Sequence, residues 1–179
     1  RVIWEYMGRG DGMPAFYGAL NALGTTPQKV VERMAIRNLL LSYRSGNLFL
    51  EPVAIESHIN GIGQVSPFRD GVEQLGVDYV WVRQAGNYQL TIDQPNLHMF
   101  VIGIDADKRA FVYDVGQQGT VDTRPYQFAY VMILNTDTHM SHRDCTMTRW
   151  SITVSDGTGI VPLNHTGETW NASNFVPVS

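Results

Sequence analysis

The sequence predicts an α+β domain in which N-terminal helices pack on a C-terminal antiparallel sheet. Apolar residues recur at helical spacing before Gly76 and at every second position after it. Helical segments followed by strand segments, instead of the two in alternation, are typical of α+β folds. We therefore expect one domain over residues 1–179, with a helical part over 1–76 and a β part over 77–179.

The composition is that of a globular protein with an ordinary core. Hydrophobic residues make up 44% of the chain and charged residues 17%. The net charge is −4 with no basic block, which argues against a nucleic-acid partner. No apolar run is long enough for a bilayer span, and no segment resembles a signal peptide, so we expect no membrane partner.

Cys145 is the single cysteine, so an internal disulfide framework is impossible. A chain with a single cysteine fits a reducing compartment. We therefore expect a cytoplasmic location, which includes the cytoplasm of a host cell. Glycan acceptor tripeptides begin at Asn164 and Asn171, but they would be used only in a secretory setting. A start at Arg1 instead of Met is expected of a piece cut from a longer precursor.

Three helices are predicted before residue 77. A short strand at Arg1–Tyr6 and a glycine-rich loop precede them. The predicted helices cover residues 15–23, 27–43 and 68–75. Pro14 and Pro27 suit a first helical turn, where the missing N–H costs nothing, and Thr26 is a capping residue. Glycine follows the first and third predicted helices and ends them.

Alternating apolar residues predict a run of strands in the β part. They cover residues 77–83, 88–92, 98–104, 110–113, 126–134 and 148–154. Residues 60–63 are glycine-rich and predict a flexible loop, and residues 158–179 are rich in turn formers. The C-terminal segment is expected to drape over the body of the domain.

The segment from Asn96 to Gly116 predicts a hairpin that joins two candidate functional residues. His98 opens the first apolar run, a charged turn follows, and Asp114 ends the second run. An antiparallel return would place these two side chains side by side. A carboxylate beside an imidazole fixes the tautomer of a general base and stabilises its cation. A surface histidine beside a turn aspartate without a catalytic role is the alternative.

Two stretches resemble the papain-like thiol hydrolases. Residues 10–20, GDGMPAFYGAL, resemble the glycine-aspartate-glycine, cysteine, aromatic, alanine-leucine signature of ovarian-tumour deubiquitinases, with one extra residue. The His98 and Asp114 spacing resembles that of viral leader proteases and bacteriocin-processing peptidases. Asp114-Val115-Gly116 is also similar to a motif of the arylamine N-acetyltransferases. The resemblance spans about two thirds of the chain and implies a papain-like fold.

The resemblance implies a role for each residue that aligns with the family motif. Ala15 occupies the position of the nucleophile, where a helix start would lower a thiol pKa. His98 would move the proton and Asp114 would orient the imidazole. The oxyanion hole would lie at Asp11, Gly12 and Met13. Neither a metal nor a cofactor is implied.

Ala15 departs from the family pattern, because a methyl group cannot attack a carbonyl. An engineered Cys→Ala substitution, a natural pseudoenzyme and an accidental resemblance all fit this departure. The first implies a viral or effector protease, or a deubiquitinase-like domain, inactive as it stands. Its substrate would be a peptide or isopeptide bond in a viral polyprotein or in a host protein such as ubiquitin.

Other residues offer alternatives. Cys145 could be the nucleophile in the His, Asp, Cys order of adenovirus-type and SUMO-type proteases, but the residues after it alternate like a strand. His139, His142 and Asp144 could join Cys145 in binding a metal, but their spacing matches no zinc pattern. The alternative to every enzymatic function is a non-catalytic β-rich structural or interaction module, such as a viral coat domain. In that case Ala15 and His98 would not meet across a cleft.

Overall fold

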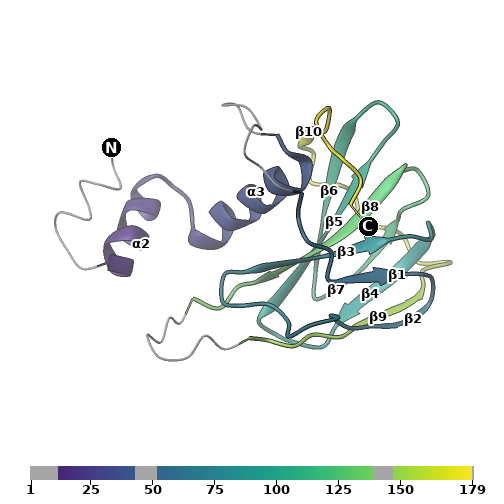
Figure 1. Cartoon of the computed structure of the whole chain (residues 1–179), viewed down its shortest axis with the longest axis horizontal. Coiled ribbons are helices and arrows are strands. Elements are labelled where there is room, and N and C mark those ends of the chain that lie inside the picture. The colour runs from purple at the N-terminus through teal and green to yellow at the C-terminus, as the bar shows by residue number, and fades with distance from the viewer. Residues whose placement is uncertain (1–11, 43–51, 139–146, 179) are drawn as a thin grey trace.

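The computed structural model describes residues 12–42, 52–138 and 147–178, with residues 12–14 described by their backbone alone (Figure 1). The helices are α2 (Gly12–Ala22) and α3 (Pro27–Leu40). The strands are β1 (Ser57–Ile59), β2 (Gly63–Val65), β3 (Val77–Val82), β4 (Asn87–Ile92), β5 (Leu97–Ile104), β6 (Arg109–Gly116), β7 (Gln118–Asp122), β8 (Phe128–Asn135), β9 (Ile152–Asp156) and β10 (Thr169–Asn171). The mixed α+β class predicted from the sequence is confirmed.

The strands form two sheets with a regular pairing order. The six-stranded sheet runs β1-β3-β8-β5-β6-β10, and the four-stranded sheet runs β2-β9-β4-β7. From β2 to β9 the strands pair from the outside inward: β2 with β9, β3 with β8, β4 with β7, and β5 with β6. A long two-stranded ribbon wrapped around a barrel gives this order, which is the jelly-roll arrangement. β1 and β10 extend the larger sheet at its two edges.

The two sheets enclose the main core, and α3 covers a second one. Val80 and Val131 of the larger sheet meet Leu90 and Val154 of the smaller sheet in a single buried cluster. On the opposite face of the larger sheet, a second cluster contains Ile36 and other apolar residues of α3. β5 and β8 are therefore buried on both faces, which explains why their sequences are continuous apolar runs.

Local sequence signals and long-range hydrogen bonds hold α3 in place. The Thr26 side chain accepts a hydrogen bond from the Lys29 N–H and caps the first turn. The helix ends before Leu41, which adopts a left-handed conformation with φ 51°. The hydroxyl of Tyr79 on β3 donates to the carbonyl of Ala35 at 2.8 Å. This contact fixes the helix against the outer face of the larger sheet.

α2 lies beside the two sheets and does not cover them, at the left of Figure 1. A 3.4 Å hydrogen bond from the Tyr17 hydroxyl to the carbonyl of Thr138 links this helix to the segment that follows β8. Gly24, with φ 68°, lets the chain turn between α2 and α3. Within the described ranges, no helix is long and apolar enough to cross a membrane.

The predicted helix over residues 68–75 is wrong. Val72 instead forms an antiparallel bridge with Thr148, and their backbone groups exchange hydrogen bonds of 3.0 and 2.9 Å. Gly71 adopts φ 108°, and a Cβ atom there would lie 2.3 Å from the carbonyl oxygen of Thr148. The segment consists of bends, the bridge at Val72 and a turn at residues 74–75, and its close approach to Thr148 leaves no room for a helix.

Other parts of the prediction also need correction. Four strands were not predicted, namely β1, β2, β7 and β10, and the first two lie within the supposed helical part over 1–76. A second sheet covers the face that a single-sheet fold would leave open, and β1 pairs with β3 in parallel. The strand predicted at Arg1–Tyr6 lies outside the described residues.

Candidate functional site

The hairpin of β5 and β6 brings His98 and Asp114 together, as the sequence indicates. Nε2 of His98 lies 2.5 Å from Oδ1 of Asp114. A register shift between Met99 and Phe100 places Asp114 opposite Phe100 on the neighbouring strand. The expected contact is therefore present, and whether it serves catalysis stays a prediction.

The pair is partly open to solvent on the helix-covered face of the larger sheet. The His98 side chain is 34% exposed and that of Asp114 55%. The Phe100 ring packs against the imidazole with centroids 4.7 Å apart. Because Asp114 occupies Nε2, Nδ1 is the ring nitrogen left to exchange a proton with another group. The geometry suits an oriented imidazole on an accessible surface.

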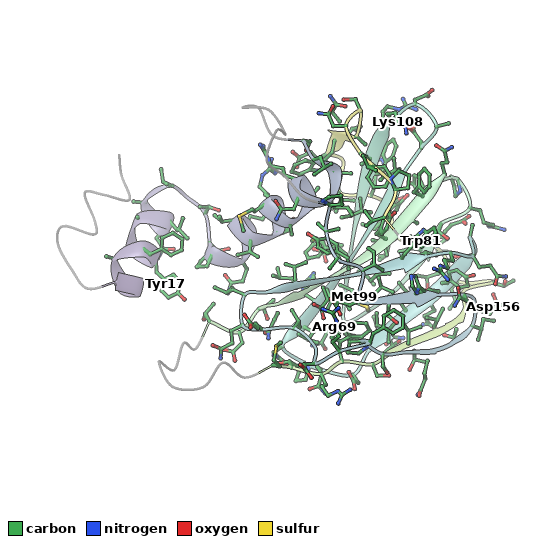
Figure 2. All side chains as sticks on the ribbon, in the orientation of Figure 1. Tyr17, Arg69, Trp81, Met99, Lys108 and Asp156 are labelled. Atoms are coloured by element: carbon green, nitrogen blue, oxygen red, sulfur yellow. The ribbon has the colours of Figure 1, made fainter. Side chains whose placement is uncertain are left out.

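Ala15 does not meet this pair in the described contacts. It is a buried residue in the first half of α2, which begins three residues earlier than predicted. The imidazole of His98 contacts Asp114 and Phe100. Figure 2 shows Tyr17, close to Ala15 in α2, well apart from Met99, the neighbour of His98. The structure brings the imidazole to the carboxylate but not to the expected nucleophile position.

The remaining predicted site residues are described in part or not at all. Gly12 and Met13 lie in the first turn of α2, where backbone N–H groups have no partner within the helix. Asp11 and Cys145 lie outside the described residues, as does the candidate ligand group that contains His139, His142 and Asp144. Over the residues that are described, no group of three or more His, Cys, Asp or Glu side chains could hold a metal ion.

An acidic pocket beside β3 was missed by the sequence analysis. It has a volume of about 430 Å³, and its charged lining consists of Glu56, Arg69, Asp70, Glu73 and Asp78. Asp78 is 8% exposed and accepts a 2.7 Å hydrogen bond from the indole N–H of Trp150. Burial raises the pKa of Asp78, the Trp150 hydrogen bond lowers it in part, and the charge of Glu56 raises it further. The sequence signal for this pocket was a single carboxylate, Asp78, within the otherwise apolar strand sequence VDYVWV.

Compared with known proteins, the chain matches no family model, no curated protein and no solved structure. The resemblance to papain-like hydrolases thus gains no support from relatives. Arguments about function rest on the strand topology and on the side chains described above.

Proposed function

We propose that this chain is a non-catalytic structural module that assembles with further copies of itself, in the manner of a viral coat domain. The observation that carries the proposal is the nested pairing of β2 with β9, β3 with β8, β4 with β7 and β5 with β6. Jelly rolls of this kind serve in viral capsids, and also in lectins and cupins.

The packing of the sandwich supports a role at the surface. Side chains from both sheets fill the space between them in one continuous apolar cluster. A filled interior leaves the rims, the loops and the outer faces as the places where function can reside. Exposed large apolar residues, including Ile62, Phe68 and Val161, occur at those rims. Apolar side chains exposed in this way are available for contact with another protein surface.

The size of the purified chain in solution tests this proposal. We expect sedimentation velocity to show species larger than a dimer that grow with protein concentration, and electron microscopy to show regular particles or sheets. A chain that sediments as a monomer at every concentration and ionic strength tested would contradict the proposal.

A thiol hydrolase with its nucleophile replaced is the second candidate, and the contact between His98 and Asp114 favours it. In this candidate the two residues would serve a thiol at position 15, and the substrate would be a peptide or a ubiquitin-like protein. The separation of α2 from the hairpin in Figure 2 weighs against it.

Installing the thiol tests the second candidate. The Ala15→Cys variant, made with Cys145→Ser to remove background labelling, should react with an electrophilic thiol probe and cleave peptide or ubiquitin-chain substrates. Adding His98→Ala should abolish cleavage, because the general base is lost. A folded Ala15→Cys variant with neither labelling above a denatured control nor cleavage would exclude this candidate.

A further inference from the structure

The pocket beside β3 carries more negative charge than its own residues balance. Its charged lining consists of four carboxyl groups and one guanidinium group, from Glu56, Asp70, Glu73, Asp78 and Arg69. None of the five forms an ion pair with another described residue. A concave site lined mainly by one sign of charge attracts a ligand of the opposite sign. The pocket therefore favours a cation.

The deepest carboxyl group presents an acceptor without a donor to this pocket. Asp78 is 8% exposed, so the residue is more than nine-tenths buried. Its Oδ2 accepts the hydrogen bond from the Trp150 indole, but no described residue donates to Oδ1. Oδ1 is not one of the fully enclosed polar atoms that lack a partner, so it faces accessible space, and Asp78 lines the pocket. A carboxylate oxygen at this depth favours a ligand that supplies a donor.

Backbone hydrogen bonds fix the walls of the pocket. Val72 and Thr148 exchange two of them, at 3.0 and 2.9 Å. The Phe68 N–H donates to the carbonyl of Glu56 at 2.9 Å, which ties the residues that lead into the pocket to the start of β1. A site whose walls are already in place loses less free energy to ordering when a ligand binds.

The spread of the carboxyl groups favours an organic cation over a metal ion. Asp70 and Glu73 are exposed, Glu56 is half-buried and Asp78 is buried, so the acceptors extend from the surface inward. Over the described ranges, no three acidic, histidine or cysteine side chains converge closely enough to hold a metal. The volume of about 430 Å³ admits a group of several heavy atoms. A planar guanidinium group has N–H donors along its edges and can serve carboxylates on several sides.

We propose that this pocket binds a guanidinium group, with Asp78 as its deepest acceptor and Asp70 and Glu73 as the acceptors nearest to solvent. An arginine side chain of a partner protein and a free small guanidine both offer this chemistry. The inference goes beyond the proposed structural function and does not depend on it, because binding at this pocket requires no assembly of the chain. Arg69 opposes the ligand through its like charge.

The nuclear magnetic resonance signal of the Trp150 indole N–H tests the proposal, because this group donates to Asp78. A Trp150→Phe variant assigns the signal, and the indole of Trp170, which packs beside Arg33 and Arg37, is the internal control. Ethylguanidinium chloride should shift the Trp150 signal saturably, with a dissociation constant on the order of 1 mM. At equal ionic strength, neutral ethylurea and tetramethylammonium, which has no N–H donor, should not shift it.

Isosteric substitutions of the exposed acceptors test which residues bind. Asp70→Asn and Glu73→Gln should each weaken ethylguanidinium binding about threefold to tenfold, because a charge-assisted hydrogen bond is lost. Asp107→Asn is the control with the same change in net charge, at a side chain that is 77% exposed, and it should leave binding unchanged. Figure 2 shows its neighbour Lys108 well apart from Arg69. Arg69→Gln should strengthen binding about twofold, because a like charge is removed.

A tripeptide with blocked ends and a central arginine distinguishes the two sources of the guanidinium group. Binding as tight as that of ethylguanidinium assigns the pocket to a side chain of a partner protein, and binding more than about tenfold weaker assigns it to a free small guanidine. The proposal is overturned if ethylurea shifts the Trp150 signal equally, or if ethylguanidinium gives no shift up to about 50 mM. Equal weakening by Asp107→Asn and by the pocket variants would also overturn it.

Discussion

Asp78 is a carboxylic acid on the inward face of β3, between the apolar core and the acidic pocket that contains Glu56. Burial raises its pKa in the folded state above the ordinary value of about 4. The folded protein therefore binds the proton of this carboxyl group more tightly than the unfolded chain does. The stabilisation from this proton is complete below the ordinary carboxyl pKa, and it is lost as the pH rises through the raised pKa.

The Asp78→Asn substitution should remove the loss of folding stability that accompanies ionisation of Asp78. The amide is neutral and keeps an oxygen that can accept the hydrogen bond from Trp150. We expect the variant to be at least as stable as the wild type near pH 7, and its stability to change less than that of the wild type between about pH 4 and pH 7. Urea unfolding at several pH values measures both effects.

Trp150→Phe provides the comparison for the Asp78 prediction, because it keeps an aromatic ring and removes the donor. It should lower the free energy of unfolding by about 1–3 kcal/mol at neutral pH, since the buried carboxylate loses its partner. An Asp78→Asn variant that is as destabilised as Trp150→Phe at every pH would show that the ionised carboxylate stabilises the fold.

Single residues were predictable where their partners are close in the sequence. The contact between His98 and Asp114 follows from one hairpin, so alternation and a turn signal were enough to predict it. Asp78 and Trp150 are 72 residues apart, and their contact depends on how the two sheets pack. No local pattern carries that information.

At the scale of elements, the cap of α3 offers a defined test. Thr26→Ala removes the side-chain oxygen that accepts the Lys29 N–H and should cost about 1 kcal/mol of stability. Thr25→Ala is the control, since Thr25 donates to the carbonyl of Leu20 through its backbone N–H, which the substitution keeps. Thermal unfolding followed by circular dichroism compares the two. Equal effects would show that the cap does not stabilise this helix.

Helices with strong end signals were predicted well, and short extended segments were not. Thr26, Pro27 and the apolar spacing located α3. The segment around Gly71 has Ser66-Pro67 before it and Gly76 after it, which are also helix signals, but the pairing of Val72 with Thr148 overrides them. β1, β2 and β10 have three residues each, which is too short for an alternating pattern to be recognised.

At the scale of the whole molecule, the mixed class was predictable and the sandwich was not. Which strands are neighbours depends on pairings between distant segments, such as Val65 with Ile152. Periodicity predicts where a strand lies and which face it buries, but not its neighbour in the sheet. The papain-like arrangement was inferred from the order of helices and strands and from short motifs at residues 10–20, His98 and Asp114. That order also fits a jelly roll preceded by two helices.

The position of β9 between β2 and β4 has a consequence for synthesis of the chain. While the polypeptide is still emerging from a ribosome, β2 and β4 have no strand to join them until residues 152–156 are free. The smaller sheet is therefore completed by a late segment, and the apolar face that β9 covers stays open to chaperones until then.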